Sequence, residues 1–570
     1  MKSEVVKILQ NAFKELDLKL KDSEIEEIIE IPKNYELGDY AFPCFFLAKI
    51  LKTAPHEIAV NVRQKIEFDK NIFEDIQAVG PYINFFVNKL NFSFNFLQGI
   101  LQKKEKFGKI LNTEKDKKTI MVEFPSPNTN KPLHLGHLRN MAIGESVSRI
   151  LEFSGYKVIR ANLNNDRGIH ICKSMAAYSK FGKNKVPGKI KGDHFVGEFY
   201  VKFNEKSKTD NDLEILSHRL LQKYEEGDKK TLALWKKMNN WALKGFEKTY
   251  SKFGIKHQVE DYESKIYKKG KEIVFDGLNK GIFKKDKSGA IIYDLRKKNL
   301  GEKVLLRADG TSIYITQDLY LAKSRFEKYK LDELIYVVGN EQDYHFNVLF
   351  ELLEKLGITS KDKLNHLSYG MVFLPEGKMK SREGTVVDAD DLIEKVQNLV
   401  KKELIERAKL SNVQLEKRSL IISLAAIKYI LLKTDIRKNM VFDPKNSINF
   451  EGDTGPYIQY SYARASSILK KAKIEQNAKK EIDKIEPNEF LVIKKMSEFP
   501  LIISKSANDL NPSLISNYVY ELSQLFNEFY HACPVIGSDK EFFRLNIVKT
   551  FRDVIKSGLY LIGIDVLEEM

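Results

Sequence analysis

The fold is decided by the stretch Glu123-Phe-Pro-Ser-Pro-Asn-Thr-Asn-Lys-Pro-Leu-His-Leu-Gly-His-Leu-Arg139. Residues 119–124 form a short apolar run typical of a strand, and after the stretch apolar residues recur at helical spacing as far as Gly155. A strand, a proline-broken loop and the first turn of a helix are a layout suited to phosphate, because backbone N–H groups and the positive end of the helix dipole point into the loop. The sequence therefore predicts an anion site at this loop.

The loop adds two imidazoles and a glycine, His134-Leu-Gly136-His137. Histidines can donate hydrogen bonds to a phosphate whose charge grows during a reaction. Gly136 lets a flat ring lie against the backbone, which a Cβ would prevent. Two histidines three residues apart could instead be a zinc pair or inconsequential surface residues, but no Cys or His cluster completes a tetrahedral site. We therefore expect no metal site here.

The same stretch resembles a known family. His134-Leu-Gly136-His137 resembles the first ATP-binding motif of class I aminoacyl-tRNA synthetases, and the surrounding residues resemble arginyl-tRNA synthetases in particular. The resemblance implies that Pro127, His134, Gly136 and His137 bind ATP. It also implies that the two histidines act in catalysis.

Length and composition limit the class of protein. A chain of 570 residues predicts about three or four domains. We expect a cytoplasmic protein without a membrane partner, because no long apolar run and no signal peptide are visible and the three cysteines lie far apart. A formal charge of +16 favours a polyanionic partner such as nucleic acid, although plentiful Lys, Ile, Asn and Phe could equally reflect nucleotide bias in the coding sequence.

The pattern changes along the chain, which predicts three domains. Residues 1–90 combine an amphipathic helix with a strand signal and predict a small α+β domain. Strands and helices alternate from about 115 to 415, which predicts an α/β domain with a doubly wound, Rossmann-like parallel sheet and a lysine-rich helical insertion at about 180–300. Long amphipathic helices predict an all-helical domain over residues 416–570.

A turn, Asn164-Asn-Asp166-Arg-Gly168, follows the second strand of this sheet. Ligands bind at the carboxyl edge of open parallel sheets, so the turn could contribute to a site. It could equally be an ordinary loop.

A second basic loop lies one βα pass later, at Gly377-Lys-Met-Lys-Ser-Arg-Glu-Gly384. It resembles the Lys-Met-Ser-Lys-Ser loop of class I synthetases, although the second lysine of that motif falls at Ser381. Pyrophosphate departure needs positive charge nearby, and Lys131, three residues before His134, can supply it, as can Lys380 and Arg382. The resemblance implies ATP binding by Lys378, Met379, Lys380 and Ser381, and catalytic roles for Lys131, Lys378, Lys380 and Arg382.

A third set of residues concerns the amino acid. A guanidinium group is planar, has five donors and requires carboxylates and carbonyls in a fixed fork. Tyr314 and Asp318 lie on one face if their segment is helical, although Asp318 without the family pattern would be read as a capping or solvated residue. The segments around Tyr314 and Gln342 resemble the substrate segments of arginyl-tRNA synthetases. The resemblance implies that L-arginine is bound by Glu123, Ser126, Asn128, Tyr314, Asp318 and Gln342.

The two ends of the chain extend the resemblance to almost its whole length. Residues 1–90 resemble the N-terminal domain with which this family contacts the elbow of the tRNA, and residues 416–570 resemble its anticodon-binding domain. The resemblance implies ligation of L-arginine to tRNA(Arg) via arginyl-adenylate. It also implies ATP with Mg²⁺ as a substrate complex, no tightly bound cofactor, and a monomer.

Two other functions stay open. The chain could be another class I enzyme, charging glutamate, glutamine or cysteine, but a glutamate pocket would need a cation where Glu123 and Asp318 are expected. It could also be a non-catalytic tRNA-binding paralogue. Such a protein is expected to carry damaged ATP motifs, whereas both histidines and Gly136 are intact.

Overall fold

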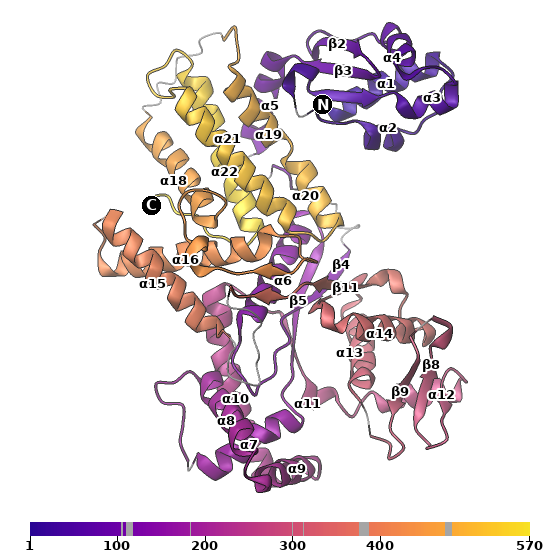
Figure 1. Cartoon of the computed structure of the whole chain (residues 1–570), viewed down its shortest axis with the longest axis vertical. Coiled ribbons are helices and arrows are strands. Elements are labelled where there is room, and N and C mark those ends of the chain that lie inside the picture. Colours follow the sequence, from indigo (N-terminus) through magenta and orange to yellow (C-terminus); the bar gives the residue numbers. More distant parts are fainter. Residues whose placement is uncertain are drawn as a thin grey trace. The chain divides into compact units, whose positions relative to one another are not determined.

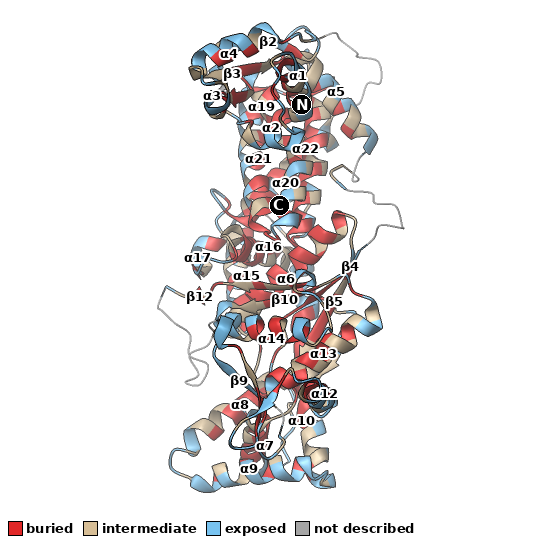
Figure 2. Cartoon of the chain, turned by 90° about the vertical axis from the view of Figure 1, so that its right-hand side faces the viewer, coloured by how far each residue is buried: buried red, intermediate tan, exposed pale blue. Residues whose placement is uncertain are grey.

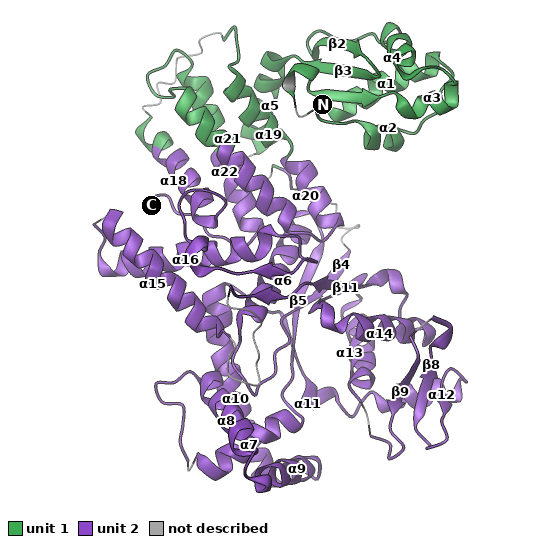
Figure 3. Ribbon diagram, in the orientation of Figure 1, with its two compact units in different colours: residues 1–107, 468–498, 525–551 green, residues 108–467, 499–524, 552–570 purple. Residues whose placement is uncertain are grey.

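Figure 1 shows the computed structural model, which describes residues 1–32, 34–103, 107–109, 118–182, 184–298, 300–311, 313–375, 387–407, 409–472 and 482–570. The chain divides into two compact units (Figure 3). Unit 1 contains residues 1–107, 468–498 and 525–551, and unit 2 contains residues 108–467, 499–524 and 552–570. Each unit has its own hydrophobic core.

Unit 1 begins with a small α+β domain, as the sequence predicted. Its antiparallel sheet has the order β1-β3-β2, with β1 at Tyr40–Pro43, β2 at Phe73–Val79 and β3 at Tyr82–Val87. Its helices are α1 (Lys2–Glu15), α2 (Asp22–Ile28), α3 (Phe45–Leu51) and α4 (Pro55–Gln64). One stripe of α1 is buried, which is the face expected of an amphipathic helix that covers a sheet.

Helices from distant parts of the sequence complete unit 1. They are α5 (Lys89–Lys103), α19 (Pro487–Ser497) and parts of α21 (Ser513–Ala532) and α22 (Glu541–Leu561). The rings of Phe92 in α5 and Phe490 in α19 lie 6.0 Å apart. A buried ion pair of 2.8 Å joins Lys494 Nζ in α19 to Asp39 Oδ1 beside β1. The N-terminal domain is therefore packed against helices that follow it by several hundred residues.

Unit 2 is built on a five-stranded parallel sheet, which confirms the predicted doubly wound α/β fold (Figure 1). The strand order is β11-β10-β4-β5-β6, so the chain starts in the middle and adds strands on both sides. The strands are β4 (Thr119–Glu123), β5 (Lys157–Asn164), β6 (Val259–Tyr262), β10 (Glu333–Gly339) and β11 (Leu364–Tyr369). The carboxyl end of every strand meets the same edge of the sheet.

Helices connect and cover these strands. They are α6 (Leu135–Phe153) after β4, α7 (Ile169–Phe181) after β5, α13 (Tyr314–Tyr329) before β10 and α14 (Asp343–Lys355) after it. Helix α6 is buried along most of its length (Figure 2). Its first turn follows the loop after β4 and so begins on the carboxyl side of the sheet.

The range 180–300, expected to be one helical insertion, has two parts in the structure. Helices α8 (Gly192–Lys206), α9 (Asn211–Glu225) and α10 (Lys229–Phe253) pack with α7 around a separate core. The rest of the range returns to the sheet through β6, followed by α11 (Glu263–Ile266), α12 (Lys271–Asn279) and a small antiparallel sheet of β7 (Lys284–Lys285), β8 (Ile291–Asp294) and β9 (Glu302–Leu306). Strand β6 was not predicted from the sequence because it is a four-residue edge strand, Val-Glu-Asp-Tyr, with one buried residue and two adjacent acidic ones.

The C-terminal third is helical, as predicted, apart from one short strand. Its remaining elements are α15 (Ala389–Arg407), α16 (Asn412–Lys433), α17 (Pro444–Ser447), α18 (Gly455–Lys471) and α20 (Phe499–Asn508), with β12 (Val372–Phe373) pairing to β13 (Met440–Val441). In the described part of the chain, no helix combines the length and hydropathy needed to cross a membrane.

Within unit 2, residues at the end of α22 are bound to α6, the helix that follows the central strand of the parallel sheet. Ser146 Oγ in α6 donates to the Leu561 carbonyl at 2.8 Å, and Arg149 donates to the Tyr560 carbonyl at 2.9 Å. Lys428 Nζ in α16 donates to the Gly563 carbonyl at 2.5 Å. Helix α6 is thus held at its far end by residues about four hundred positions later in the sequence.

Candidate active site

The loop between β4 and α6 is hydrogen-bonded to β5 and to Asn165 directly after it. Ser126 has a left-handed φ of 54°, its N–H donates to Asn162 Oδ1 at 3.1 Å, and its carbonyl accepts from Asn165 Nδ2 at 3.0 Å. The Asn165 N–H donates to the Pro127 carbonyl at 3.0 Å. These bonds fix the carboxyl edge of the sheet and leave Asn128 exposed.

His134 and His137 form one unit at the start of α6. His134 Nδ1 accepts from the Gly136 N–H at 3.2 Å, and His137 Nδ1 accepts from the His134 N–H at 3.1 Å. The two ring centroids are 3.9 Å apart. Because Nδ1 is an acceptor in both rings, each neutral imidazole carries its proton on Nε2. Each ring can therefore donate one hydrogen bond from Nε2.

Both imidazoles are held in the neutral form. Burial, together with the charge of Lys131, lowers the pKa of His134 to about 3. Burial also lowers the pKa of His137 well below its usual value, and His134 and Lys131 contribute. The positive charge of this site therefore comes from Lys131 and the α6 dipole rather than from the rings.

Gly136 makes room for an aromatic ring, and within the chain that ring is the imidazole of His134. A Cβ at Gly136 would lie 3.0 Å from Cε1 and 3.1 Å from Nδ1 of His134. This is closer than ordinary van der Waals contact, so a side chain at this position would push against the imidazole. Contact between Gly136 and ATP stays a prediction.

The second basic loop cannot be placed against this site. Lys378, Met379, Lys380, Ser381 and Arg382 lie outside the described residues. The residues that follow are described, and they adjoin the histidine stretch: the Leu135 N–H donates to the Val387 carbonyl and the Ala389 N–H to the Leu133 carbonyl, both at 3.0 Å.

A cavity of about 590 Å³ opens beside His134. One wall is the loop from Lys131 to His134 together with Asp388. The opposite wall is one face of α8, which contributes His194, Gly197, Glu198, Val201, Lys202 and Glu205. The helical insertion therefore forms part of the wall next to the histidine pair.

Each carboxylate oxygen of Glu123 has one partner within the protein. Arg325 of α13 donates from Nη1 to Glu123 Oε2 and binds Asp261 Oδ2 at 2.9 Å, while Ser126 Oγ donates to Glu123 Oε1 at 3.1 Å. Arg325 is only 1% exposed. The sequence assigned Glu123 to the charged groups of a substrate, and in the structure an internal guanidinium already meets one of its oxygens.

The other predicted amino-acid residues lie at the starts of two neighbouring helices. Tyr314 is the first residue of α13 and is 68% exposed, and Asp318 follows one turn later. Asp318 Oδ2 lies 2.8 Å from His345 Nε2 in the first turn of α14. Gln342 directly precedes α14 and is exposed. The structure thus brings the predicted α13 and α14 segments together.

Two further carboxylates, Glu263 and Asp166, belong to the same acidic group, in which Glu263 interacts with both Asp318 and Asp166. The pKa of Glu263, the first residue of α11, is raised to about 7, chiefly by burial; the charges of Asp166 and Asp318 contribute to the rise, and Arg167 opposes it. Ser264 donates to Asp166 from its N–H at 2.8 Å and from Oγ at 2.7 Å. Asp166 lies in the turn after β5 that the sequence flagged. Glu263 was missed, because its only sequence signal is its place after the unrecognised strand β6.

Three family models match successive parts of the chain. Residues 96–444 match the family model described as "tRNA synthetases class I (R), catalytic domain". Residues 458–570 match the "DALR anticodon binding domain", and residues 2–87 match the "Arginyl tRNA synthetase N terminal domain".

Curated relatives span almost the full chain. The arginine–tRNA ligase of Treponema denticola is 44% identical over 95% of this chain and 94% of its own length. That of Borrelia hermsii is 43% identical over 100% of this chain and 99% of its own.

Solved structures share the fold. The arginyl-tRNA synthetase of Thermus thermophilus superposes with a TM-score of 0.83 at 24% identity, and both chains are covered completely. That of Plasmodium falciparum gives 0.81 at 22% identity, covering 100% of this chain and 99% of the other. From the family models and the relatives together, the chain belongs to the arginyl-tRNA synthetase family of class I tRNA synthetases.

Proposed function

We propose that this chain is an arginine–tRNA ligase that activates L-arginine with the Mg²⁺ complex of ATP and transfers the arginyl group to tRNA(Arg). The proposal rests on two features at the carboxyl edge of one parallel sheet. One is the neutral imidazole pair at the start of α6, and the other is the acidic group formed by Asp318, Glu263 and Asp166. The relatives of 41–44% identity named arginine–tRNA ligase support it.

In the first step an oxygen of the arginine carboxylate attacks the α-phosphorus of ATP. The new C(=O)–O–P bond forms as the bond to the β-phosphate oxygen breaks, and pyrophosphate leaves with its electron pair. No side chain becomes covalent, so positioning and charge stabilisation carry the rate. The ribose of the terminal adenosine of the tRNA then attacks the acyl carbon and AMP leaves.

The histidine stretch is assigned to the phosphates. The Nε2–H groups of His134 and His137 donate to phosphate oxygens, and Lys131 supplies positive charge as pyrophosphate departs. Pro127 and Gly136 border the nucleotide. Lys378, Met379, Lys380, Ser381 and Arg382 of the second loop keep the ATP-binding and catalytic roles that the resemblance implies.

The acidic group is assigned to the guanidinium. Asp318 and Glu263 offer carboxylate oxygens, with Asp166 behind Glu263, and Tyr314 and Gln342 orient the substrate. Ser126 and Asn128 hold the amine or carboxylate of arginine. Glu123, with one oxygen taken by Arg325, meets the α-ammonium through its other oxygen, which Ser126 shares.

The ends of the chain are assigned to tRNA. Residues 1–90 contact the elbow, residues 416–570 bind the anticodon, and residues 115–415 perform the chemistry. The net charge of +16 supports a polyanionic partner. We place the enzyme in the cytoplasm, acting as a monomer.

Pyrophosphate exchange tests the proposal. We expect exchange with arginine and none with glutamate, glutamine or cysteine, measured with and without tRNA. Asp318→Asn should raise the KM for arginine by about tenfold, since a charged hydrogen bond is lost, with the KM for ATP unchanged. Asp294→Asn, which alters an exposed pair with Arg296, is the control. Exchange with another amino acid, or tRNA binding without any exchange, would refute the assignment.

A further inference from the structure

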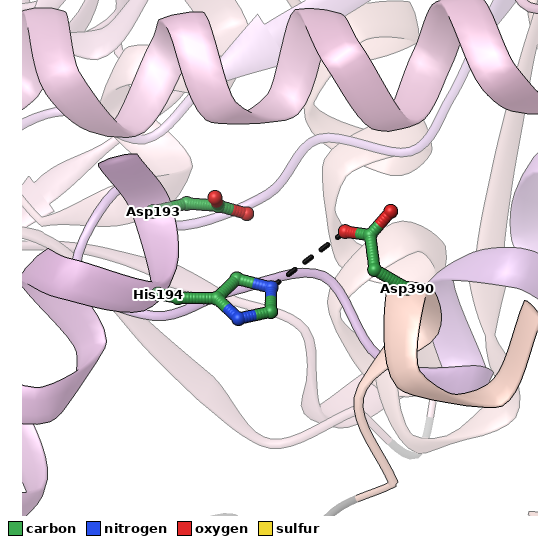
Figure 4. A group of neighbouring side chains, drawn as sticks. All are labelled: Asp193, His194 and Asp390. Carbon is green, nitrogen blue, oxygen red and sulfur yellow. Dashed lines mark ion pairs between the residues drawn. The ribbon is translucent and has the colours of Figure 1, made fainter. Parts of the chain in front are cut away.

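An ion cluster joins the start of α8 to the start of α15 (Figure 4). Lys191, directly before α8, places Nζ 2.9 Å from Asp193 Oδ2 and 2.5 Å from Asp390 Oδ2. His194 Nε2 lies 3.2 Å from Asp388 Oδ2 and 3.6 Å from Asp390 Oδ2. Thr249 Oγ1 in α10 donates to Asp390 Oδ2 at 2.9 Å. Three helices and the segment after the second basic loop therefore share one set of charges.

The cluster resembles a metal site but is closed by an ammonium group. In the described part of the chain, Asp193, His194 and Asp390 each place a ligand atom within 4.8 Å of the others. Lys191 Nζ bonds both carboxylates. The Asp193 side chain is fully buried, and its other oxygen packs against Gly245, where a Cβ would overlap it. The chain thus supplies the cation itself, and the cluster acts as a joint between segments.

Glycines bring α8 unusually close to its neighbours. A Cβ at Gly192 would overlap the Trp241 carbonyl of α10. A Cβ at Gly197 would lie 2.6 Å from Cδ of Pro132, the residue after Lys131. Helix α8 is therefore wedged between α10 and the loop that carries Lys131 and His134.

The segment 387–390 is consequently held from two sides. Its backbone pairs with the histidine stretch through the Val387 carbonyl and the Ala389 N–H. Of its side chains, Asp390 is bound by Lys191, and Asp388 Oδ2 lies 3.2 Å from His194 Nε2, an ion pair when the imidazole is protonated. Without Lys191 and His194, the side chains of this segment would keep the bond from Thr249 Oγ1 to Asp390 and the more distant Lys252 Nζ, 3.8 Å from Asp390 Oδ1. The second attachment would therefore be weakened.

We propose that Lys191 and His194 are positioning residues that hold Asp388 and Asp390, and with them the segment 387–390, against the His134 stretch. The helical insertion thereby sets the geometry of the ATP site. This inference rests on the proposed ATP-dependent function. We expect a change in the KM for ATP rather than in the KM for arginine. Among the described residues, the interactions of Asp318 and Glu263 do not include any residue of the ion cluster.

The test compares Lys191→Met and Lys191→Arg with the matched control Lys173→Met. Lys173 lies in α7 of the same helical cluster and pairs with Glu214 of α9 at 3.0 Å, away from residues 387–390. In Lys191→Met the KM for ATP in arginine-dependent pyrophosphate exchange should rise by about tenfold or more, since small displacements of positioning groups cost on this order. The KM for arginine should stay within about twofold. Lys191→Arg should recover most of the ATP KM, and Lys173→Met should leave it unchanged.

Calorimetric binding of ATP to each variant keeps this test separate from the proposed function. If the parent protein shows no exchange with arginine, the proposed function is wrong. A Kd for ATP that is about tenfold weaker in Lys191→Met, and in no other variant, would still support the positioning role of Lys191. An unchanged ATP Kd, equal rises in both KM values, or equal effects of Lys191→Met and Lys173→Met would overturn it. If Lys191→Met does not fold, the charge-balanced pair Lys191→Met with Asp390→Asn is measured under the same criteria.

Discussion

The imidazoles of His134 and His137 are uncharged, and their proposed role in the reaction gives this a consequence for pH dependence. Burial lowers the pKa of His134 to about 3 from 6.5, so the ring is neutral throughout the range from pH 6 to 8. We expect kcat for pyrophosphate exchange to show no imidazole titration in that range. A kcat inflection near pH 6.5 that disappears in His134→Asn would contradict this prediction.

The same lowered pKa affects stability at acid pH. The unfolded chain binds a proton on this imidazole below pH 6.5, whereas the folded chain binds it only near pH 3. Each unit by which the pH falls between 6.5 and 3 therefore lowers the free energy of unfolding by about 1.4 kcal/mol through this group. Urea unfolding of the parent protein and His134→Asn at pH 5 and 7 measures the effect, which should be smaller in the variant.

Burial shifts the pKa of Glu263 upward, whereas it shifts the pKa of His134 downward. The pKa of Glu263 is raised to about 7 by burial, so the carboxyl is protonated below pH 7 and charged above it. A guanidinium prefers the charged form, and the KM for arginine should fall as pH rises through 7. Glu263→Gln should abolish this dependence and raise the KM by about ten- to hundredfold, since a hydrogen bond to a charged group contributes about 1.5–3 kcal/mol.

The KM for ATP, measured over the same pH range, is the control for Glu263. Its profile should be the same in the parent protein and in Glu263→Gln, because the carboxyl lies in the acidic group rather than beside the histidines. An arginine KM that stays pH-dependent in the variant would remove Glu263 from the pocket.

Individual site residues could be predicted from the sequence only where they belong to a recognisable motif. His134 and His137 stand in a recognisable element, and Tyr314 and Asp318 in a recognisable segment. Arg325 lies seven residues after Asp318, on a related face of the same helix, so helical spacing could have revealed it. Glu263 could not be found, because its role depends on a strand end that local pattern does not reveal.

At the scale of elements, α13 joins two strands through one buried arginine. Arg325 bridges Glu123 at the end of β4 and Asp261 in β6. Arg325→Met leaves two carboxylates without their cation and should lower the free energy of unfolding by about 3–5 kcal/mol. It should also raise the KM for arginine, because Glu123 loses the partner that orients it.

Arg160 provides the matched comparison. It is also buried and bridges two carboxylates, Glu145 at 2.8 Å and Glu152 at 2.7 Å, both on α6. Arg160→Met should cost similar stability but leave the KM for arginine unchanged. Urea unfolding and exchange kinetics on both variants decide the matter. A rise in the KM of both would reduce Arg325 to a purely structural role.

A strand could be predicted from the sequence when its own residues form a clear apolar pattern. Strand β10 has four consecutive buried residues and was evident from the sequence, whereas β6 has one buried residue in four and was not. A short edge strand gains its stability from its neighbour in the sheet, which local periodicity does not record.

At the scale of the whole molecule, the α+β, α/β and helical parts follow one another along the chain as predicted. The two compact units do not follow this division, because each combines segments that are far apart in the sequence. Residues 468–498 and 525–551 pack with residues 1–107, and the buried pair of Lys494 and Asp39 lies among them. Contacts between segments so far apart leave no periodic trace in the sequence. They could be known only from the structure.

The net charge of +16 leads to a prediction for the whole molecule. If about four phosphates are neutralised, tRNA affinity should fall by about a hundredfold between about 50 and 200 mM salt, because counterions are released on binding. Filter binding across this range measures the slope. A salt-independent affinity would show that the charge is not used on tRNA.

The bonds that α6 and α16 make to residues at the end of α22 and just after it share one chemical property. Ser146, Arg149 and Lys428 all donate to main-chain carbonyls, those of Leu561, Tyr560 and Gly563. Every amino acid carries such a carbonyl, so the residues on the accepting side can change through evolution while the bonds persist. Recombination that exchanges the C-terminal helices between related genes would therefore keep this attachment, and chimaeric enzymes would inherit a working connection to the helix that carries the imidazoles.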